Sequence, residues 1–274
     1  RYIGASLRVK RIVDSHYPTL SPNDLATHAR ALMRDLALSM LPVIDEDKVV
    51  GVIKRSHVLM LTSTRSNALV KDLMDTPSLV FRDDEMVSDV IKVMIEFDEW
   101  YAPVINPRNN KYIGIVSLAS FLRTIHRTLI KEKLGLELSK IMTKNVEYVL
   151  PEDHISKLWR KMSELRISGF PVVRSPKDVR VIGMVTQHDL IRKGYTRIEL
   201  ESESGPRKGV KVRDAMTSPA ITLHYADDVS KALSIMVKKD IGRIPIINDE
   251  GKLVGIVDRS DVSKVILELK LMKR

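Results

Sequence analysis

The chain repeats one pattern four times, and this repeat limits the possible folds more than any other feature of the sequence. In each copy a methionine is followed nine residues later by a proline that opens a short apolar run, and a glycine follows in a second apolar run. The glycines come 9, 11, 12 and 10 residues after the prolines, and a turn between the two runs absorbs the difference. Numbered copy 1 to copy 4, the sets are Met33, Pro42 and Gly51; Met94, Pro103 and Gly114; Met162, Pro171 and Gly183; and Met236, Pro245 and Gly255.

The spacing within each copy predicts an opening strand, a helix, a two-stranded hairpin and a closing helix, which is a βαββα unit. In copies 3 and 4, apolar residues that include the methionine recur at i, i+3, i+4 and i+7, the period of a helix with one buried face. Ser21-Pro22 and Asp227 are predicted helix starts in copies 1 and 4. The apolar sets in copies 3 and 4 are Ile155, Leu158, Trp159 and Met162, and Val229, Ala232, Leu233 and Met236.

A single unit of this size is too small to bury a stable core, so we expect adjacent copies to pair. Between the two pairs, residues 123–136 are predicted to continue a helix closed by Gly135, and 199–211 are predicted to form a loop. The predicted domain boundaries are residues 8–60, 69–124, 137–194 and 211–268.

Composition narrows the functional classes. The chain has no cysteine, which excludes disulfides, thiolate nucleophiles and cysteine-ligated metal centres. Its apolar runs are too short to span a bilayer, and no leader precedes the repeats, so we expect a soluble cytoplasmic protein without membrane contact. The net charge of +10 indicates attraction to polyanions, which could be nucleotide phosphates, nucleic acid or an acidic protein.

Short motifs in the opening, middle and closing segments of the copies are similar to those of a known family. Together they resemble the CBS-domain family, named for cystathionine β-synthase, in its four-copy form as in the regulatory γ subunit of AMP-activated protein kinase and stand-alone archaeal relatives. The resemblance covers almost the whole chain and implies an α+β fold of four CBS repeats forming two paired (Bateman) modules, packed into a disc. The motifs are 141–143 (Ile-Met-Thr), 215–217 (Ala-Met-Thr), 73–74 (Leu-Met), 168–173 (Ser-Gly-Phe-Pro-Val-Val), 183–189 (Gly-Met-Val-Thr-Gln-His-Asp) and 255–261 (Gly-Ile-Val-Asp-Arg-Ser-Asp).

The resemblance also implies an adenine-nucleotide site between the copies of a pair. A carboxylate can accept both ribose hydroxyls, and a guanidinium suits phosphate oxygens. The implied ribose-binding residues are Asp189, Asp261 and Thr186. The implied phosphate-binding residues are Arg243, Ser260, Ser168, Arg259 and Lys144, and the implied adenine-lining residues are Val146, Ile221, Ile244, Phe170 and Gly169.

Two features of these motifs leave alternatives open. Thr186 and Asp189 also have the spacing of a helix capping box, so they could stabilise a helix start with or without a ligand. In copy 4, Asp258 stands where the family has a hydroxyl residue, and like-charge repulsion there predicts a preference for fewer phosphates or for another ligand.

Copies 1 and 2 depart from the family pattern. The closing motif of copy 1 ends on His57, and that of copy 2 ends on Ser120, where the acid is expected. Ribose recognition should therefore be poor in the first pair. We favour sites that are empty or weak, and the alternative is an anion site built from Lys54, Arg55 and His57.

The functional prediction is a regulatory protein that senses energy state by binding AMP, ADP or ATP. No phosphate-binding glycine loop, metal-ligand spacing or nucleophile motif is found, so we expect no enzyme activity, catalytic cofactor or metal. Its signal would pass to a protein effector, and a homodimer is possible. The alternatives are a nucleic-acid or polyanion binder, which the aromatic content of 5% disfavours, and an S-adenosylmethionine-binding CBS protein.

Overall fold

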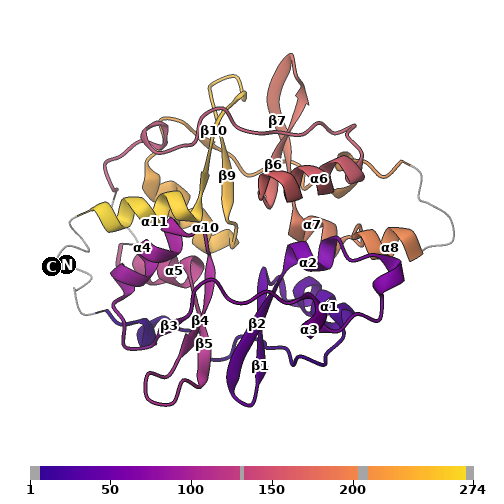
Figure 1. The fold of residues 1–274 in the computed structure, drawn as a ribbon. Helices are drawn as coiled ribbons and strands as arrows, with labels where there is room; N and C mark the ends of the chain where they lie inside the picture. The colour runs from indigo at the N-terminus through magenta and orange to yellow at the C-terminus, as the bar shows by residue number, and fades with distance from the viewer. Residues whose placement is uncertain (1–6, 130–132, 203–208, 270–274) are drawn as a thin grey trace.

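A computed structural model describes residues 7–129, 133–202 and 209–269. It contains four similar units, each with a small sheet and flanking helices (Figure 1). Copy 1 contains η1 (Val9–Arg11), α1 (Ala26–Leu36), β1 (Met40–Asp45), β2 (Lys48–Lys54), α2 (Arg55–Leu59) and η2 (Ser63–Arg65); copy 2 contains α3 (Val70–Leu73), β3 (Phe81–Arg82), α4 (Val87–Glu96), β4 (Tyr101–Ile105), β5 (Tyr112–Ser117) and α5 (Leu118–Leu129).

Copies 3 and 4 repeat the order of elements. Copy 3 contains η3 (Leu138–Lys140), α6 (Ile155–Leu165), β6 (Gly169–Ser175), β7 (Asp178–Thr186), α7 (Gln187–Arg192) and α8 (Arg197–Ser202). Copy 4 contains α9 (Val212–Ala215), β8 (Leu223–His224), α10 (Val229–Lys239), β9 (Arg243–Ile247), β10 (Leu253–Asp258) and α11 (Arg259–Glu268). The predicted α+β fold of four βαββα repeats is therefore present.

The same sheet topology occurs in all four copies. The two hairpin strands pair antiparallel, and in copies 2 and 4 the short opening strand runs parallel to the middle strand. In copies 1 and 3 the opening strand is reduced to single bridges, Leu20 to Val43 and Val149 to Val172. The repeated proline is the third residue of the middle strand in every copy, so it lies near the strand start as expected.

Within each pair, the opening segment of one copy crosses to the closing strand of the other. The repeated glycine is required for this crossing, because a Cβ at Gly183 would lie 2.9 Å from Met216 Sδ, and one at Gly51 would lie 2.5 Å from Met74 Sδ. The crossings occur at four isolated bridges: Asp14 to Ile115, Asp75 to Val52, Thr143 to Ile256 and Thr217 to Met184. We call copies 1 and 2 the first module and copies 3 and 4 the second module.

The two modules pack through their helices (Figure 1). Copy 1 meets copy 3 through α1, α2 and α7, and copy 2 meets copy 4 through α4, α5, α10 and α11. The contact between copies 2 and 4 is part of one apolar core, in which Phe121 and Met94 lie in the same cluster as Met236 and Ile266. Apolar burial therefore holds the modules together, since it is the main favourable term in packing.

Four local predictions need correction. α1 begins at Ala26, not at Ser21, whose backbone N–H instead donates to Asp24 in a turn. α10 is capped by Asp228 rather than Asp227, and Asp228 also accepts hydrogen bonds from the backbone N–H groups of Leu134, Gly135 and Leu136.

The connector and the loop also differ from the prediction. α5 is described as far as Leu129, residues 130–132 lie outside the described residues, and 133–136 are not helical. Part of the predicted loop is helical, because α8 runs to Ser202 and contacts η2 of copy 1. None of the helices described in the three ranges above is long and apolar enough to cross a membrane.

Candidate functional site

Asp189 lies where copy 3 meets the opening segment of copy 4, and its side chain is bound from both sides. Asp189 Oδ2 accepts hydrogen bonds from the backbone N–H and the hydroxyl of Thr186, at 2.9 and 3.0 Å. Asp189 Oδ1 accepts a hydrogen bond from the Thr217 hydroxyl of copy 4, at 3.0 Å. The residue is 6% exposed. The predicted capping box is therefore real, and the same carboxylate also joins the two copies.

Asp261 holds the equivalent position in copy 4. Its Oδ2 accepts from the backbone N–H of Asp258, while Asp258 Oδ1 accepts from the backbone N–H of Asp261 and from the Ser260 hydroxyl. Burial and the neighbouring Asp258 carboxylate raise the pKa of Asp261 to about 7. The Ser260 hydroxyl is thus already bonded to Asp258. Asp258 and Asp261 take the places that Thr186 and Asp189 hold in copy 3.

Two predicted phosphate-binding residues come together across the second module. The Arg243 guanidinium of copy 4 donates a hydrogen bond to the Ser168 hydroxyl of copy 3, at 2.6 Å. Burial lowers the pKa of Arg243, and the nearby Asp258 and Asp98 carboxylates oppose that shift. The arrangement places a partly buried cation at the junction of two copies.

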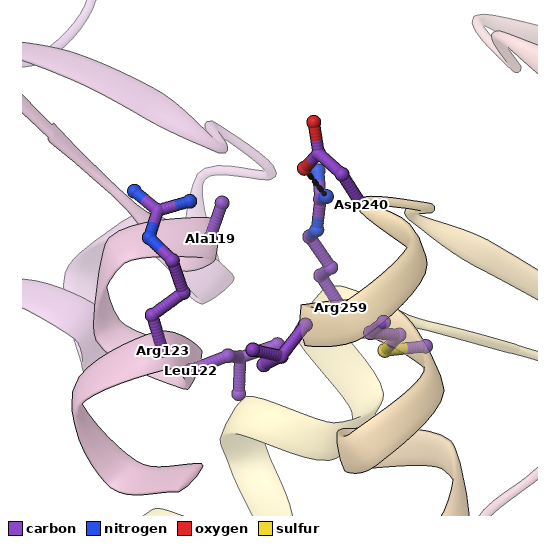
Figure 2. A pocket seen from close by; sticks show the side chains of 7 residues that line it. Ala119, Leu122, Arg123, Asp240 and Arg259 are labelled. Atoms are coloured by element: carbon purple, nitrogen blue, oxygen red, sulfur yellow. Dashed lines mark hydrogen bonds and ion pairs between the residues drawn. The ribbon is translucent and has the colours of Figure 1, made fainter. Parts of the chain in front are cut away.

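The remaining predicted phosphate-binding residues are placed differently. Arg259 is 7% exposed, and its guanidinium donates to Asp240 Oδ1 at 2.9 Å. Figure 2 shows it beside a hollow between α5 and α10, with Arg123 on the opposite side. That hollow has a volume of about 10 Å³, which is room for one water molecule. Lys144 is exposed on the opening segment of copy 3.

The five predicted adenine-lining residues do not share one surface. Phe170 and Ile244 are 0% exposed and belong to the core, because strand residues alternate and their neighbours Gly169 and Arg243 take the other face. Assigning Phe170 and Ile244 to the wall of a ligand site is thus corrected. Gly169 lies against Thr186, where a Cβ would be 3.0 Å from its methyl group. Ile221, by contrast, is 42% exposed.

Val146 lines a hollow formed by residues of copy 3. This open hollow has a volume of about 520 Å³, and its lining includes neither Asp189 nor Asp261. Lys161 also lines it; its ammonium donates to the Tyr148 carbonyl at 2.8 Å and lies 5.4 Å from the centre of the Phe170 ring. The hollow that Val146 lines thus contains neither of the two predicted ribose-binding carboxylates.

The first module fills the equivalent positions with its own side chains. At the position of Asp189 in copy 1, His57 Nε2 lies 3.0 Å from Asp75 Oδ2, and Asp75 stands where copy 4 has Thr217. Beside this pair, Lys54 Nζ lies 2.9 Å from Glu99 Oε1, which also accepts from the Ser78 hydroxyl at 2.7 Å. This ion pair joins copies 1 and 2, so Lys54 and His57, two of the three residues suggested for an anion site, already contact carboxylates. The third, Arg55, donates from Nε to the Leu38 carbonyl at 2.9 Å.

The other junction of the first module is closed by aromatic rings. Ser120 replaces the acid and bonds to Ser117 within the closing motif of copy 2. Tyr17, at the position of Val146, packs on Tyr101, at the position of Arg243, with ring centroids 6.3 Å apart. The Tyr17 hydroxyl donates to the Met40 carbonyl at 2.6 Å. This tyrosine pair replaces the implied adenine-lining and phosphate-binding residues.

Several residues of the junctions were missing from the sequence prediction. Thr143 and Thr217 lie in the repeated opening motifs, which signalled a shared role without showing that they face the closing motif of the other copy. Tyr101 stands two residues before its proline, as Arg243 does, so aligning the copies could have found it. Trp100 of copy 2 lies with its ring 4.7 Å from the Arg243 guanidinium carbon, and no motif indicated that contact.

Comparison with known proteins gives one family. The family model described as CBS domain matches residues 9–63, 70–127, 138–195 and 212–268. Protein MJ1225 of Methanocaldococcus jannaschii, whose structure is described as that of a proposed archaeal homologue of g-AMPK, is similar in fold, with a TM-score of 0.83 at 20% identity over 94% of this chain and 99% of that one. A conserved protein of Pyrococcus horikoshii has a TM-score of 0.65 at 22% identity, covering 95% of this chain and all of its own.

Relatives found by sequence extend beyond this chain. The uncharacterized protein MJ1404 of Methanocaldococcus jannaschii is 27% identical over 271 residues, which cover 96% of this chain and 62% of the relative. The chain spans 45% and 55% of the next two relatives that it matches.

Proposed function

Since the chain belongs to the CBS-domain family and carries four copies of the domain, we propose that its second module binds adenine nucleotides and that the bound state is passed to a protein partner. Binding without chemical conversion fits a regulatory family. The first module would serve as a docking platform, because its own side chains occupy the equivalent positions.

The observation that carries this proposal is the hydrogen bond between Asp189 and Thr217. A buried carboxylate shared between two copies can exchange a threonine hydroxyl for a ribose hydroxyl with little change in its own position. Hydrogen bonds to an ionised acceptor are about twice as strong as neutral ones, which favours such a site for sugar recognition. A ligand held there would contact both copies at once.

The charge of the second module supports a phosphate on the ligand. Arg243 and Ser168 converge on one point between copies 3 and 4, and a guanidinium can make two parallel hydrogen bonds to phosphate oxygens. A ligand that bridges the copies would favour one relative arrangement of them, and its effect on a partner is limited to its difference in affinity between the arrangements.

Calorimetric titration of ligand-stripped protein tests the proposal. AMP, ADP and ATP should bind with at least one site per chain, and Asp189→Ala should abolish that site. His57→Ala in the first module is the matched control and should leave the affinity unchanged. Equal nucleotide affinity in wild type and Asp189→Ala would remove the assignment.

A second ligand class is favoured by one observation, the paired carboxylates of Asp258 and Asp261. Two acids at one junction suit a cationic adenosine derivative such as S-adenosylmethionine better than a polyphosphate. The same titration distinguishes the two, because Asp258→Ser should weaken binding of the cation and strengthen binding of AMP.

A further inference from the structure

The Arg243 guanidinium of copy 4 contacts residues from two other copies. It belongs to β9 of copy 4 and donates to Ser168 of copy 3, while the indole ring of Trp100 from copy 2 covers it with 4.7 Å between the guanidinium carbon and the ring centroid. Trp100 comes from the first module, so the contact crosses between modules. A cation over an indole face is attracted by the ring quadrupole.

The neighbouring backbone fixes the indole in this place. A Cβ at Gly242 would lie 2.7 Å from Trp100 Cζ3, so only glycine leaves room for the ring. The Trp100 carbonyl accepts a hydrogen bond from the Leu118 N–H at 3.0 Å, and the side chain packs on the core shared by copies 2 and 4. The ring is thus held by both modules, and its face is available to the guanidinium.

One position of the repeat supplies three of the residues near Arg243. Trp100, Ser168 and Gly242 each stand three residues before the proline of their own copy. This position is a tryptophan in copy 2, a serine in copy 3 and a glycine in copy 4. The tryptophan supplies the ring, the serine supplies the hydroxyl, and the glycine leaves the space that the ring occupies.

Charged groups also act on the guanidinium. Asp258 of its own copy and Asp98 of copy 2 attract it, and Arg259 repels it. Charges of both signs therefore act on the guanidinium. The indole ring, with its centroid 4.7 Å from the guanidinium carbon, restricts the movement of the group while it donates to Ser168.

We infer that Trp100 is a positioning residue for the phosphate-binding guanidinium of Arg243, so that the first module completes the nucleotide site of the second. This inference rests on the proposed function. Recognition of the ligand phosphate then depends on how the two modules are docked, whereas recognition of the nucleoside does not.

The ratio of adenosine to AMP dissociation constants isolates the phosphate contribution. Trp100→Leu should lower this ratio about 3- to 30-fold, the range that corresponds to a cation–π contact, with adenosine affinity unchanged. Trp100→Phe keeps an aromatic face and should retain most of the ratio. Arg243→Met should remove the phosphate contribution in both backgrounds, so that Trp100→Leu has no further effect.

A spectroscopic readout tests the contact in folded protein. Trp100 and Trp159 are the only tryptophans, so Trp159→Phe leaves Trp100 as the sole indole fluorophore. Its emission should change when AMP binds and when Arg243 is replaced by Met, and it should respond much less to adenosine. This variant leaves the site intact, which keeps the test valid even if Trp100→Leu fails to fold.

The outcomes separate the inference from the function on which it rests. Nucleotide binding by the wild type with an unchanged adenosine-to-AMP ratio in folded Trp100→Leu, or with Trp100 emission indifferent to AMP, would overturn the inference alone. Absence of nucleotide binding by the wild type would overturn both.

Discussion

The two modules share one topology but place their carboxylates on different segments. In the second module the closing motif supplies the carboxylate and the opening segment of the other copy supplies a hydroxyl. In the first module the carboxylates have moved to the opening segments. The equivalent pairs are Asp189 with Thr217 and Asp261 with Thr143 in the second module, and His57 with Asp75 and Ser120 with Asp14 in the first.

This difference teaches that the βαββα scaffold is independent of its ligand chemistry. The crossing of opening segments and the glycine beneath each crossing occur in both modules. The side chains at the junctions differ. In the first module His57 contacts Asp75 and Lys54 contacts Glu99, whereas in the second module Asp189 accepts from Thr217 and Arg243 donates to Ser168.

Among the predicted changes that test this difference between the modules, replacing Tyr17 should have the largest effect on the free energy of unfolding. Tyr17→Ala removes a ring packed on Tyr101 and the hydrogen bond to the Met40 carbonyl, so the free energy of unfolding should fall by roughly 3 kcal/mol. Val146→Ala, at the same position of copy 3, should cost about 1 kcal/mol because a smaller, partly exposed side chain is trimmed. Urea denaturation of both variants measures the difference, and equal losses would show that Tyr17 does not close its junction.

The regular features of the fold could be predicted from the sequence because each is a local pattern. Buried helix faces such as Val229, Ala232, Leu233 and Met236 follow from the helical period, and all four are buried. Helix starts were less accurate because Asp227 and Asp228 are both good caps, and only the tertiary contacts to Leu134 and Leu136 select Asp228.

The next largest effect is a pH dependence of stability, which comes from the acid pair Asp258 and Asp261 of copy 4. The raised pKa of Asp261, about 7, means that the folded protein holds a proton between about pH 4 and pH 7 that the unfolded chain releases. The free energy of unfolding should therefore fall as pH rises through this window. Asp258→Ser removes the like charge and should flatten the slope.

Thermal melts at pH 5 and pH 7 measure that slope. Lys264 on α11, Arg243 and Asp98 also act on this acid pair and are unchanged in the variant, so the slope reports Asp258 itself. The serine pair of copy 2 is the natural control, because Ser117→Ala changes no titrating group. A slope that is identical in wild type and Asp258→Ser would show that the carboxylates are not coupled.

The ion pair of the first module should have the smallest effect. Glu99→Gln breaks the contact with Lys54, whose side chain is 39% exposed, so solvent screening limits the loss of unfolding free energy to about 0.5 kcal/mol. Nucleotide affinity should not change, since Glu99 belongs to the module that we assign to docking. A clear fall in AMP affinity by calorimetry would instead place a ligand in the first module.

The candidate site was less predictable than the fold because its residues meet only through tertiary structure. Asp189, Arg243 and Ser168 could be named from the family resemblance, and the structure brings the last two within hydrogen-bond distance. Phe170 and Ile244 were misplaced because strand alternation decides which side chain faces the core. Trp100 could not be predicted, since its contact with Arg243 depends on how the two modules pack.

A crystal structure of the protein with AMP tests the central claim most directly. We predict density for adenosine between copies 3 and 4, with the ribose on Asp189 in place of the Thr217 hydroxyl, and none beside Tyr17 and Tyr101. Density for the nucleotide in the first module, with the Asp189–Thr217 hydrogen bond intact, would contradict this account.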